Sequence, residues 1–136
     1  MRDFTDLLGR IFISGIFIFE SYDSLKYYQT TLEVLTEYGI SWNQKFLLNT
    51  SLIFIIFGSL MVLFGYRARF GAFLLMMYWI PMTFIRHSFW NDPLPIQRDQ
   101  TIQFVKNIAI AGGLLTVLLN GTGRYSIRKL FATTRV

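Results

Sequence analysis

The 20 residues from Phe46 to Gly65 carry no charged side chain, and this run constrains the fold more than any other feature. About 20 apolar residues in a helix are needed to cross the ~30 Å hydrocarbon core of a bilayer. Only 15% of the 136 residues are charged, against about 25% in ordinary soluble domains. We therefore expect an all-α integral membrane protein, with residues 1–136 forming a single transmembrane domain.

Three further apolar runs predict membrane-spanning helices beside the one at 46–65. The first covers about 6–27. A cleavable signal peptide is the competing interpretation, but no small-residue cleavage site follows the run. The third covers 70–87 and contains Pro81, and the fourth covers 100–119 after a turn at 91–95. Because the connection at 66–69 is so short, the helices that it joins should be antiparallel neighbours.

A short amphipathic segment separates the first two spans. Residues 30–38 mix Leu32, Val34 and Leu35 with glutamates, and Gly39 follows as a typical helix end. This pattern predicts a short helix lying at the membrane surface. The expected architecture is thus an antiparallel four-helix bundle with one interfacial helix between its first and second helices.

The distribution of Lys and Arg predicts the orientation, because cytoplasmic loops carry an excess of these residues. With four spans, one side would carry Arg2, Arg10, Arg67, Arg69, Arg124, Arg128, Lys129 and Arg135, and the other Lys26, Lys45, Arg86, Arg98 and Lys106. This bias places both termini in the cytoplasm. The basic tail at 120–136 then reads as a cytoplasmic flank, which is a better explanation of the net charge of +5 than nucleic-acid binding.

Polar side chains collect where the predicted helices reach the outer side of the membrane. Ionisable groups are costly at such positions and mark a pairing or a functional site. Glu20 would balance Arg86 or Lys106, His87 could exchange a proton near neutral pH, and Trp90 would supply an apolar wall. The candidate pocket residues are Glu20, Asp23, Arg86, His87, Trp90, Gln103, Lys106 and Asn107.

Such a pocket would suit a quinone headgroup, a lipid headgroup or another small molecule with polar and apolar parts. The alternative is purely structural: a pair that locks the helices, a lysine reaching the headgroups, and an aromatic belt. Ala109, Gly112 and Gly113 predict a close-packing face for another helix. The absence of cysteine excludes thiolate chemistry, and a single histidine leaves no multi-histidine metal site within one chain.

Several motifs together resemble the DoxX family of small bacterial membrane proteins. They are Gly9-Arg10, the basic turn at 64–69, His87-Ser88-Phe89-Trp90, the segments 103–109 and 112–115, and the closing motif at 121–126. The resemblance implies four transmembrane helices in the bacterial inner membrane. Some family members are subunits of thiosulfate:quinone oxidoreductase, and others are linked to membrane oxidoreductase assemblies.

The resemblance therefore implies an accessory or quinone-associated subunit of a membrane redox complex, with quinone as the candidate cofactor and other membrane subunits as partners. A cysteine-free chain fits a subunit better than a stand-alone redox enzyme. Two alternatives stay open: a non-enzymatic assembly factor for membrane proteins, and a carrier of a small lipid-like molecule. A homo-oligomer is compatible with each of them.

Overall fold

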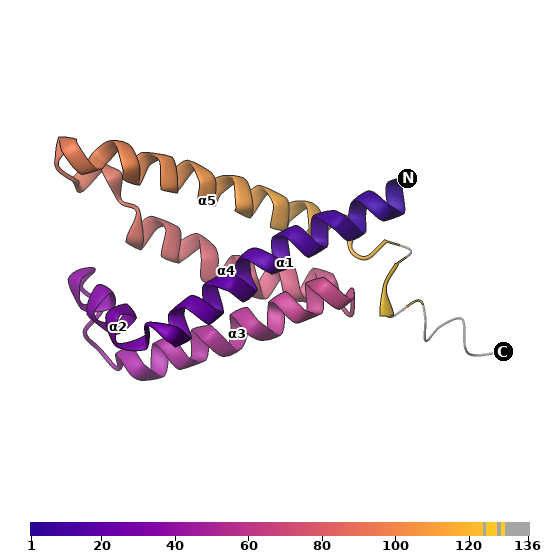
Figure 1. Cartoon of the computed structure of the whole chain (residues 1–136), viewed down its shortest axis with the longest axis horizontal. Coiled ribbons are helices and arrows are strands. Elements are labelled where there is room, and N and C mark those ends of the chain that lie inside the picture. The colour runs from indigo at the N-terminus through magenta and orange to yellow at the C-terminus, as the bar shows by residue number, and fades with distance from the viewer. Residues whose placement is uncertain (124, 128, 130–136) are drawn as a thin grey trace.

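The computed structural model describes residues 1–123, 125–127 and 129, and over these residues the chain is helical without strands (Figure 1). The long helices are α1 (Arg2–Lys26), α3 (Gln44–Phe64), α4 (Ala68–Arg86) and α5 (Leu94–Asn120), and the short ones are α2 (Tyr28–Glu37) and the 3-10 turn η1 (Phe89–Asn91). The all-α prediction is confirmed. Most of the predicted basic tail, including Arg124, Arg128 and Arg135, lies outside the described residues.

The predicted helix boundaries hold best where charge or glycine ends an apolar run. α3 ends at Gly65, whose φ of 71° is the left-handed conformation that glycine adopts readily. α5 begins at Leu94 instead of the predicted residue 100. Pro93 lies just before it, and Pro95 lies in the first turn, where a missing N–H breaks no hydrogen bond. The turn signal at 91–95 therefore includes the start of the helix.

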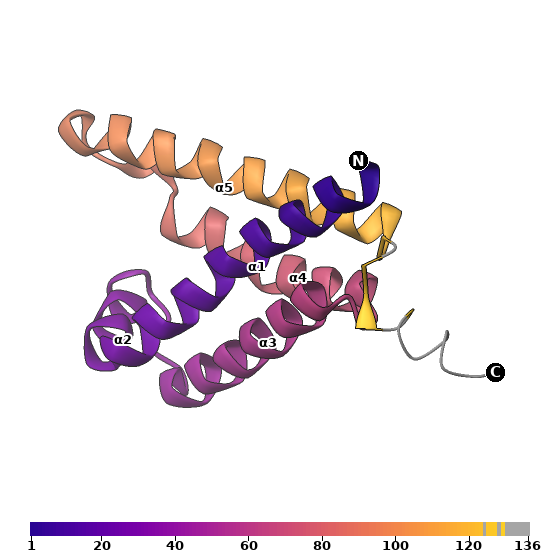
Figure 2. The ribbon, with the colours of Figure 1, turned by 45° about the vertical axis from the view of Figure 1, so that its right-hand side comes forward.

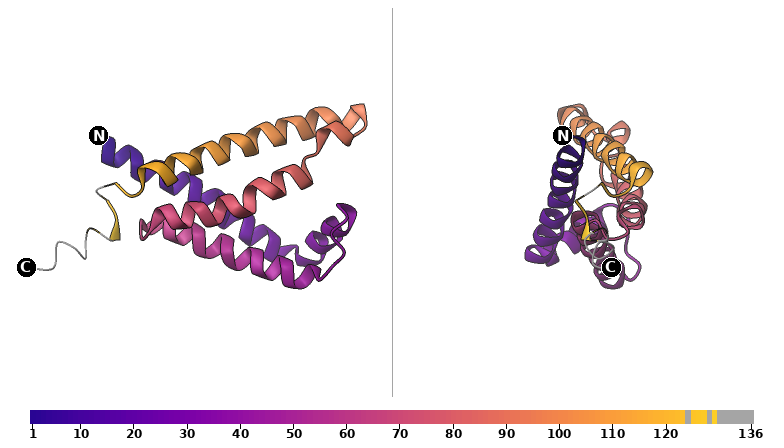
Figure 3. Two further views of the ribbon diagram at one scale, coloured as in Figure 1. Left: turned by 180° about the vertical axis from the view of Figure 1, so that it is seen from behind. Right: turned by 90° about the vertical axis from the view of Figure 1, so that its right-hand side faces the viewer.

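The helices form a layer with one helix laid across it. α4 packs between α3 and α5 in chain order, and α1 crosses one face of this layer, mainly against α3 (Figures 1 and 2). Seen from behind, α1 passes on the far side of the layer (Figure 3). The long helices therefore put the end of α1, the start of α3, the end of α4 and the start of α5 at one end of the molecule. We call this the α2 end, and the opposite end the Arg10 end.

α3 and α4 pack closely at a pair of glycines. A Cβ on Gly71 would lie 2.7 Å from the Gly58 carbonyl oxygen, so only glycine permits this approach. Around this contact the core contains Phe17, Ile55, Val62, Ala68, Ala72, Leu75, Trp79, Leu114 and Val117. This contact holds α3 and α4 together in their hairpin. Neither glycine was singled out from the sequence.

α2 matches the predicted amphipathic segment in position. It buries Leu32 and Leu35 against Leu48 and Leu52 of α3, and the helix is closed by backbone hydrogen bonds from Gly39 and Ile40 to the carbonyls of Thr36 and Leu35. Its polar face remains exposed. α2 thus covers the start of α3 as a separate short helix.

Among the described residues, 3 helical segments are long and apolar enough to cross a membrane: Gln44–Phe64, Ala68–Asn91 and Leu94–Asn120. α1 is also long, at 25 residues, but Asp6, Arg10, Glu20 and Asp23 interrupt its apolar character. Large apolar side chains such as Phe12, Phe57 and Leu119 are 62–69% exposed on the helices. Exposed apolar side chains of this kind are typical of a surface that faces lipid.

Candidate binding site at the α2 end

A cavity of about 230 Å³ lies at the α2 end between α1, α4 and α5. Its lining combines charged, amide and aromatic side chains with few aliphatic ones. The lining residues are Glu20, Tyr78, Trp79, Met82, Thr83, Arg86, His87, Gln103 and Asn107. Five of the predicted pocket residues, namely Glu20, Arg86, His87, Gln103 and Asn107, therefore lie around one space.

Glu20 of α1 and Arg86 of α4 form an ion pair across the cavity. Arg86 Nη1 donates to Glu20 Oε1 at 3.2 Å, and the side chains are 35% and 26% exposed, respectively. The sequence left Arg86 and Lys106 open as partners, and the structure joins Glu20 to Arg86. Lys106 is exposed on α5 and does not line the cavity.

His87, at the end of α4, is oriented by the first turns of α5. Its Nδ1 lies 2.7 Å from Gln100 Oε1. Because an amide oxygen can only accept, Nδ1 carries the proton in this contact, and the neutral ring then presents Nε2 as an acceptor. Gln100 thus selects the tautomer of the single histidine in the chain. The pattern of charges in the sequence does not predict this contact, because glutamine carries no charge.

Trp79 lines the cavity and connects α4 to α5 and to α1. Its indole Nε1 donates to the Asn107 carbonyl oxygen at 3.0 Å, and its ring meets Phe17 of α1 edge-on at 4.9 Å. Trp79, Thr83 and Arg86 are spaced four and three apart, so they share one face of α4. The sequence analysis missed the first two, and this spacing behind Arg86 was the signal that could have found them.

A smaller and more apolar cavity of about 130 Å³ adjoins the first beneath α2. Tyr78, Met82 and Arg86 line both cavities, and the remaining lining is mostly aliphatic, including Leu35 and Leu48. The α2 end therefore offers a polar space next to an apolar space, with three side chains shared between them.

Three predicted pocket residues lie elsewhere. Asp23 and Lys106 are exposed, and neither lines the cavity. Trp90 is half exposed, and its ring packs with Phe84, Phe89 and Phe104 at centroid distances of 5.2–6.5 Å. The break after α4 turns Trp90 away from the cavity and into this aromatic cluster, so the expected apolar wall is provided by Trp79 instead.

Of the three small residues of α5 predicted to pack against another helix, Gly113 makes a close contact with α1. A Cβ on Gly113 would lie 2.5 Å from Ile13 Cδ1, so Gly113 lets α1 approach α5 closely. Ala109 is exposed, and nothing lies within 4 Å of the position of a Cβ on Gly112. Within this chain Gly113 makes the close helix contact, and packing by Ala109 and Gly112 stays a prediction.

A buried arginine at the other end of the molecule escaped the sequence analysis. Arg10 of α1 is 1% exposed, and its Nε donates to Asp6 Oδ2 at 3.0 Å. Its Nη1 donates to the Val62 carbonyl at 3.4 Å, and its Nη2 donates to the Tyr125 carbonyl. Asp6 Oδ2 also accepts from the Gly123 backbone N–H at 3.1 Å.

The Arg10 network joins segments that are far apart in sequence. Gly65 completes it, because a Cβ there would lie 2.5 Å from Arg10 Nη1 and 2.7 Å from Ser126 Cβ. In the sequence, Gly9-Arg10, the turn at 64–69 and the motif at 121–126 are separate points of resemblance to the DoxX family. The structure shows that the three segments meet around one guanidinium group.

Among the described residues, no group of three or more His, Cys, Asp and Glu side chains lies close enough to hold a metal ion. The apolar helices, the exposed aromatic surface and the polar cavity define a small multi-pass helical membrane protein. The DoxX family profile matches residues 5–88, and the chain belongs to the DoxX family. The matched part contains Glu20, Arg86 and His87 but ends before α5, so the motifs at 103–109 and 112–115 lie outside it.

Two relatives extend the comparison. An inner membrane protein of Escherichia coli, YqjF, is 26% identical over 130 residues, covering 96% of this chain and 94% of that protein. A Surfeit locus protein 4 homolog of Schizosaccharomyces pombe is 32% identical over 91 residues, which is 65% of this chain but only 29% of that protein. No solved structure matches the chain.

Proposed function

We propose that this DoxX-family chain is an accessory subunit of a membrane redox complex and binds a quinone at the α2 end. The observation that carries the proposal is the polar cavity of about 230 Å³ beside an apolar cavity of about 130 Å³. Together they reach the lower end of the roughly 300–1,000 Å³ range of small-molecule sites. A quinone has polar ring oxygens and an apolar substituent, so it matches a polar cavity beside an apolar one.

The donor groups of the polar cavity fit a quinone ring. Arg86 has further N–H groups beyond the one that Glu20 accepts, and the Gln103 and Asn107 amides each offer an NH₂. These donors come from both α4 and α5, so they can approach a ring from two sides. A bound quinone supplies an acceptor for two electrons and two protons.

The chain's own groups would position that ring and handle protons. Glu20 holds the Arg86 guanidinium across the cavity, and Gln100 holds His87 with its Nε2 unprotonated in the neutral ring. His87 can therefore take or return a proton at Nε2. Since the chain has no cysteine and a single histidine, we assign the electron-donating centre to a partner subunit and not to this chain.

The test uses purified protein in detergent and a short-chain quinone analogue, followed by quenching of tryptophan fluorescence, since Trp79 lines the cavity. Replacing His87 and Gln103 together by alanine removes two polar contacts of about 0.5–1.5 kcal/mol each, which predicts an approximately tenfold weaker binding. Lys106→Ala is the matched control, because Lys106 lies outside the cavity. Failure of wild type to bind, or equal binding by all three proteins, would contradict the proposal.

We also propose that α1 is a fourth membrane span, that α2 lies at the membrane surface, and that both termini are cytoplasmic. The Lys and Arg distribution supports this orientation. The cysteine-free chain permits a direct test by single cysteines and a membrane-impermeant maleimide. Trp42→Cys, after α2, should be labelled in intact spheroplasts, and Tyr66→Cys, in the α3–α4 turn, should be labelled only after permeabilisation. The reverse pattern would overturn the orientation.

One observation favours a second candidate, an assembly factor that binds another membrane protein. Only 11% of the apolar window of α5 is buried inside the fold, and Val105 and Leu119 are 60% and 69% exposed. Purification in mild detergent distinguishes the candidates. A partner that is retained after alanine replacement of His87 and Gln103, in a protein that binds no quinone, would favour the assembly role. A long-chain alcohol that binds as tightly as the quinone analogue would instead indicate a lipid-like carrier.

A further inference from the structure

At the Arg10 end, a cavity of about 670 Å³ opens where α4 begins and α5 ends. Its charged lining residues are Arg67, Arg69 and Lys129, and no acidic side chain is among its described lining residues. The cavity at the α2 end is different, since its arginine is balanced by Glu20. Arg67 and Arg69 take part in no ion pair with another described residue, so their positive charge attracts an anion.

Local backbone geometry brings these cations together. Gly65 and Arg67 both have left-handed backbones, with φ of 71° and 49°, so the chain reverses sharply between α3 and α4. The Arg69 side chain then reaches over the end of α5. A Cβ on Gly121 would lie only 2.8 Å from Arg69 Nε, so the glycine permits the contact.

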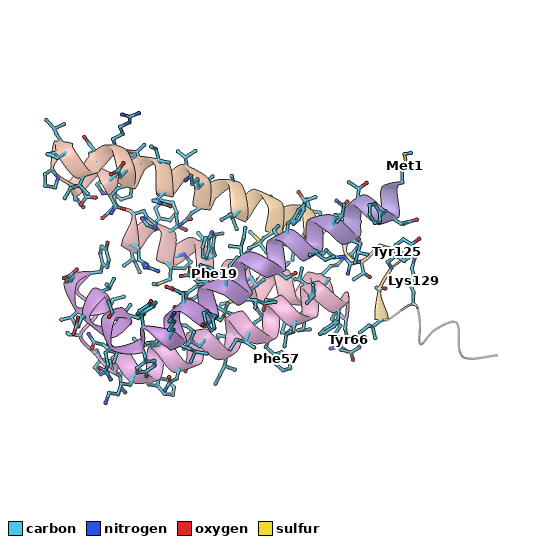
Figure 4. All side chains as sticks on the ribbon, viewed as in Figure 1. Met1, Phe19, Phe57, Tyr66, Tyr125 and Lys129 are labelled. Atoms are coloured by element: carbon cyan, nitrogen blue, oxygen red, sulfur yellow. The ribbon has the colours of Figure 1, made fainter. Side chains whose placement is uncertain are left out.

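The return of the chain after α5 supplies the third side of the cavity. Asp6 Oδ2 accepts from the Gly123 N–H, and Arg10 Nη2 donates to the Tyr125 carbonyl, so Gly123 and Tyr125 are held against α1. Tyr66, Tyr125 and Lys129 lie at this same end of the molecule (Figure 4). The cavity is thus built from α4, the end of α5 and the anchored segment behind it.

The surroundings indicate which anion the cavity fits. Phe70 lines it and is 53% exposed, and Leu119 and Phe64 nearby in the chain are 69% and 50% exposed. Tyr66 and Tyr125 are 53% and 57% exposed, as expected of tyrosines at a membrane interface. In a membrane, cations at the ends of apolar helices, beside exposed apolar rings, are expected at the depth of lipid phosphates.

We propose that this cavity binds the phosphate of one anionic phospholipid headgroup, with Arg67 and Arg69 as its principal contacts and the acyl chains lying along the apolar ends of α4 and α5. The site is separate from the proposed quinone cavity and does not depend on it. The positive charge of the site also agrees with the cytoplasmic leaflet, where anionic lipids attract basic residues near the membrane surface.

Native mass spectrometry of the detergent-solubilised protein tests the site, with phosphatidylglycerol and phosphatidylcholine added at equal concentrations. Wild type should retain phosphatidylglycerol in preference. Each basic residue near the surface strengthens lipid binding about fivefold. Arg67→Gln or Arg69→Gln should therefore weaken binding about fivefold, and the double variant about 30-fold. Detergent removes any influence of these arginines on membrane orientation.

The matched control removes the same charge at the other end of the molecule. Lys45→Gln with Arg98→Gln should leave phosphatidylglycerol binding unchanged, and Arg67→Lys with Arg69→Lys should retain most of it, which separates lost charge from lost folding. Equal retention of the two lipids by wild type, or an equal loss in the control, would overturn the site. Full displacement by millimolar inorganic phosphate would overturn the lipid assignment and indicate a free-phosphate site.

Discussion

Arg10→Leu tests the structural argument most severely, because the leucine keeps the apolar contacts of α1 and removes the buried charge. The substitution leaves the Val62 and Tyr125 carbonyls without their Arg10 donors, and Asp6 without its cation at 3.0 Å. Charged arginine is itself unfavourable within a membrane helix. If only the apolar environment of α1 mattered, replacing Arg10 by leucine would therefore stabilise the protein.

The structure predicts the opposite result. Removing one partner of a buried ion pair costs about 3–5 kcal/mol. We take the lower end, about 3 kcal/mol, because the Asp6 side chain is 27% exposed and can be solvated. For a chain of this size, a change of this magnitude lowers Tm by on the order of 10 °C.

The assay is thermal loss of helical circular dichroism in detergent, with Arg98→Leu as a control at an exposed position. Arg98→Leu should melt with wild type. Asp6→Asn should lie between the two, because the amide oxygen still accepts from Arg10 and Gly123. If Arg10→Leu melts within 2–3 °C of wild type, on the scale on which ~1 kcal/mol is detectable, the network does not hold the three segments together and the argument is refuted.

Three further substitutions, one of them a control, test single contacts in the same melting assay. Gly65→Ala places a Cβ 2.5 Å from Arg10 Nη1 at a φ of 71° and should destabilise the protein by about 1–3 kcal/mol; Gly15→Ala, with no atom within 4 Å of its Cβ, should stabilise α1 by up to about 1 kcal/mol. An equal effect of the two would exclude the steric explanation. Trp79→Phe loses the hydrogen bond to the Asn107 carbonyl and should cost about 1 kcal/mol; an unchanged Tm would show that this bond contributes nothing.

The helices could be predicted from the sequence because their signals are local. The uncharged run at 46–65 and the prolines at 93 and 95 act on the residues beside them. The rotation of each helix about its axis is different, because α3 and α4 are apolar on most sides and hydropathy then selects no face. The close approach of Gly58 and Gly71 shows which faces of α3 and α4 meet, and neither glycine stood out in the sequence.

The same reasoning explains the partial prediction of the site. Opposite charges at similar depth predicted that Glu20 pairs with a cation, and Gln103 and Asn107 were predicted among the pocket residues. The choice of Arg86 over Lys106 depended on helix rotation, and the displacement of Trp90 depended on the chain break after α4. Arg10 was missed because it was counted as a topology signal, whereas its three partners lie at positions 6, 62 and 125.

The most direct test of the proposed function is photolabelling with a photoreactive quinone analogue, followed by peptide mapping. The account predicts labels in α4 between Tyr78 and His87, near Glu20 in α1, and between Gln103 and Asn107 in α5, all suppressed by excess unlabelled quinone. Labels confined to the exposed faces of α3 and α5, or labels that excess quinone does not suppress, would contradict a quinone site at the α2 end.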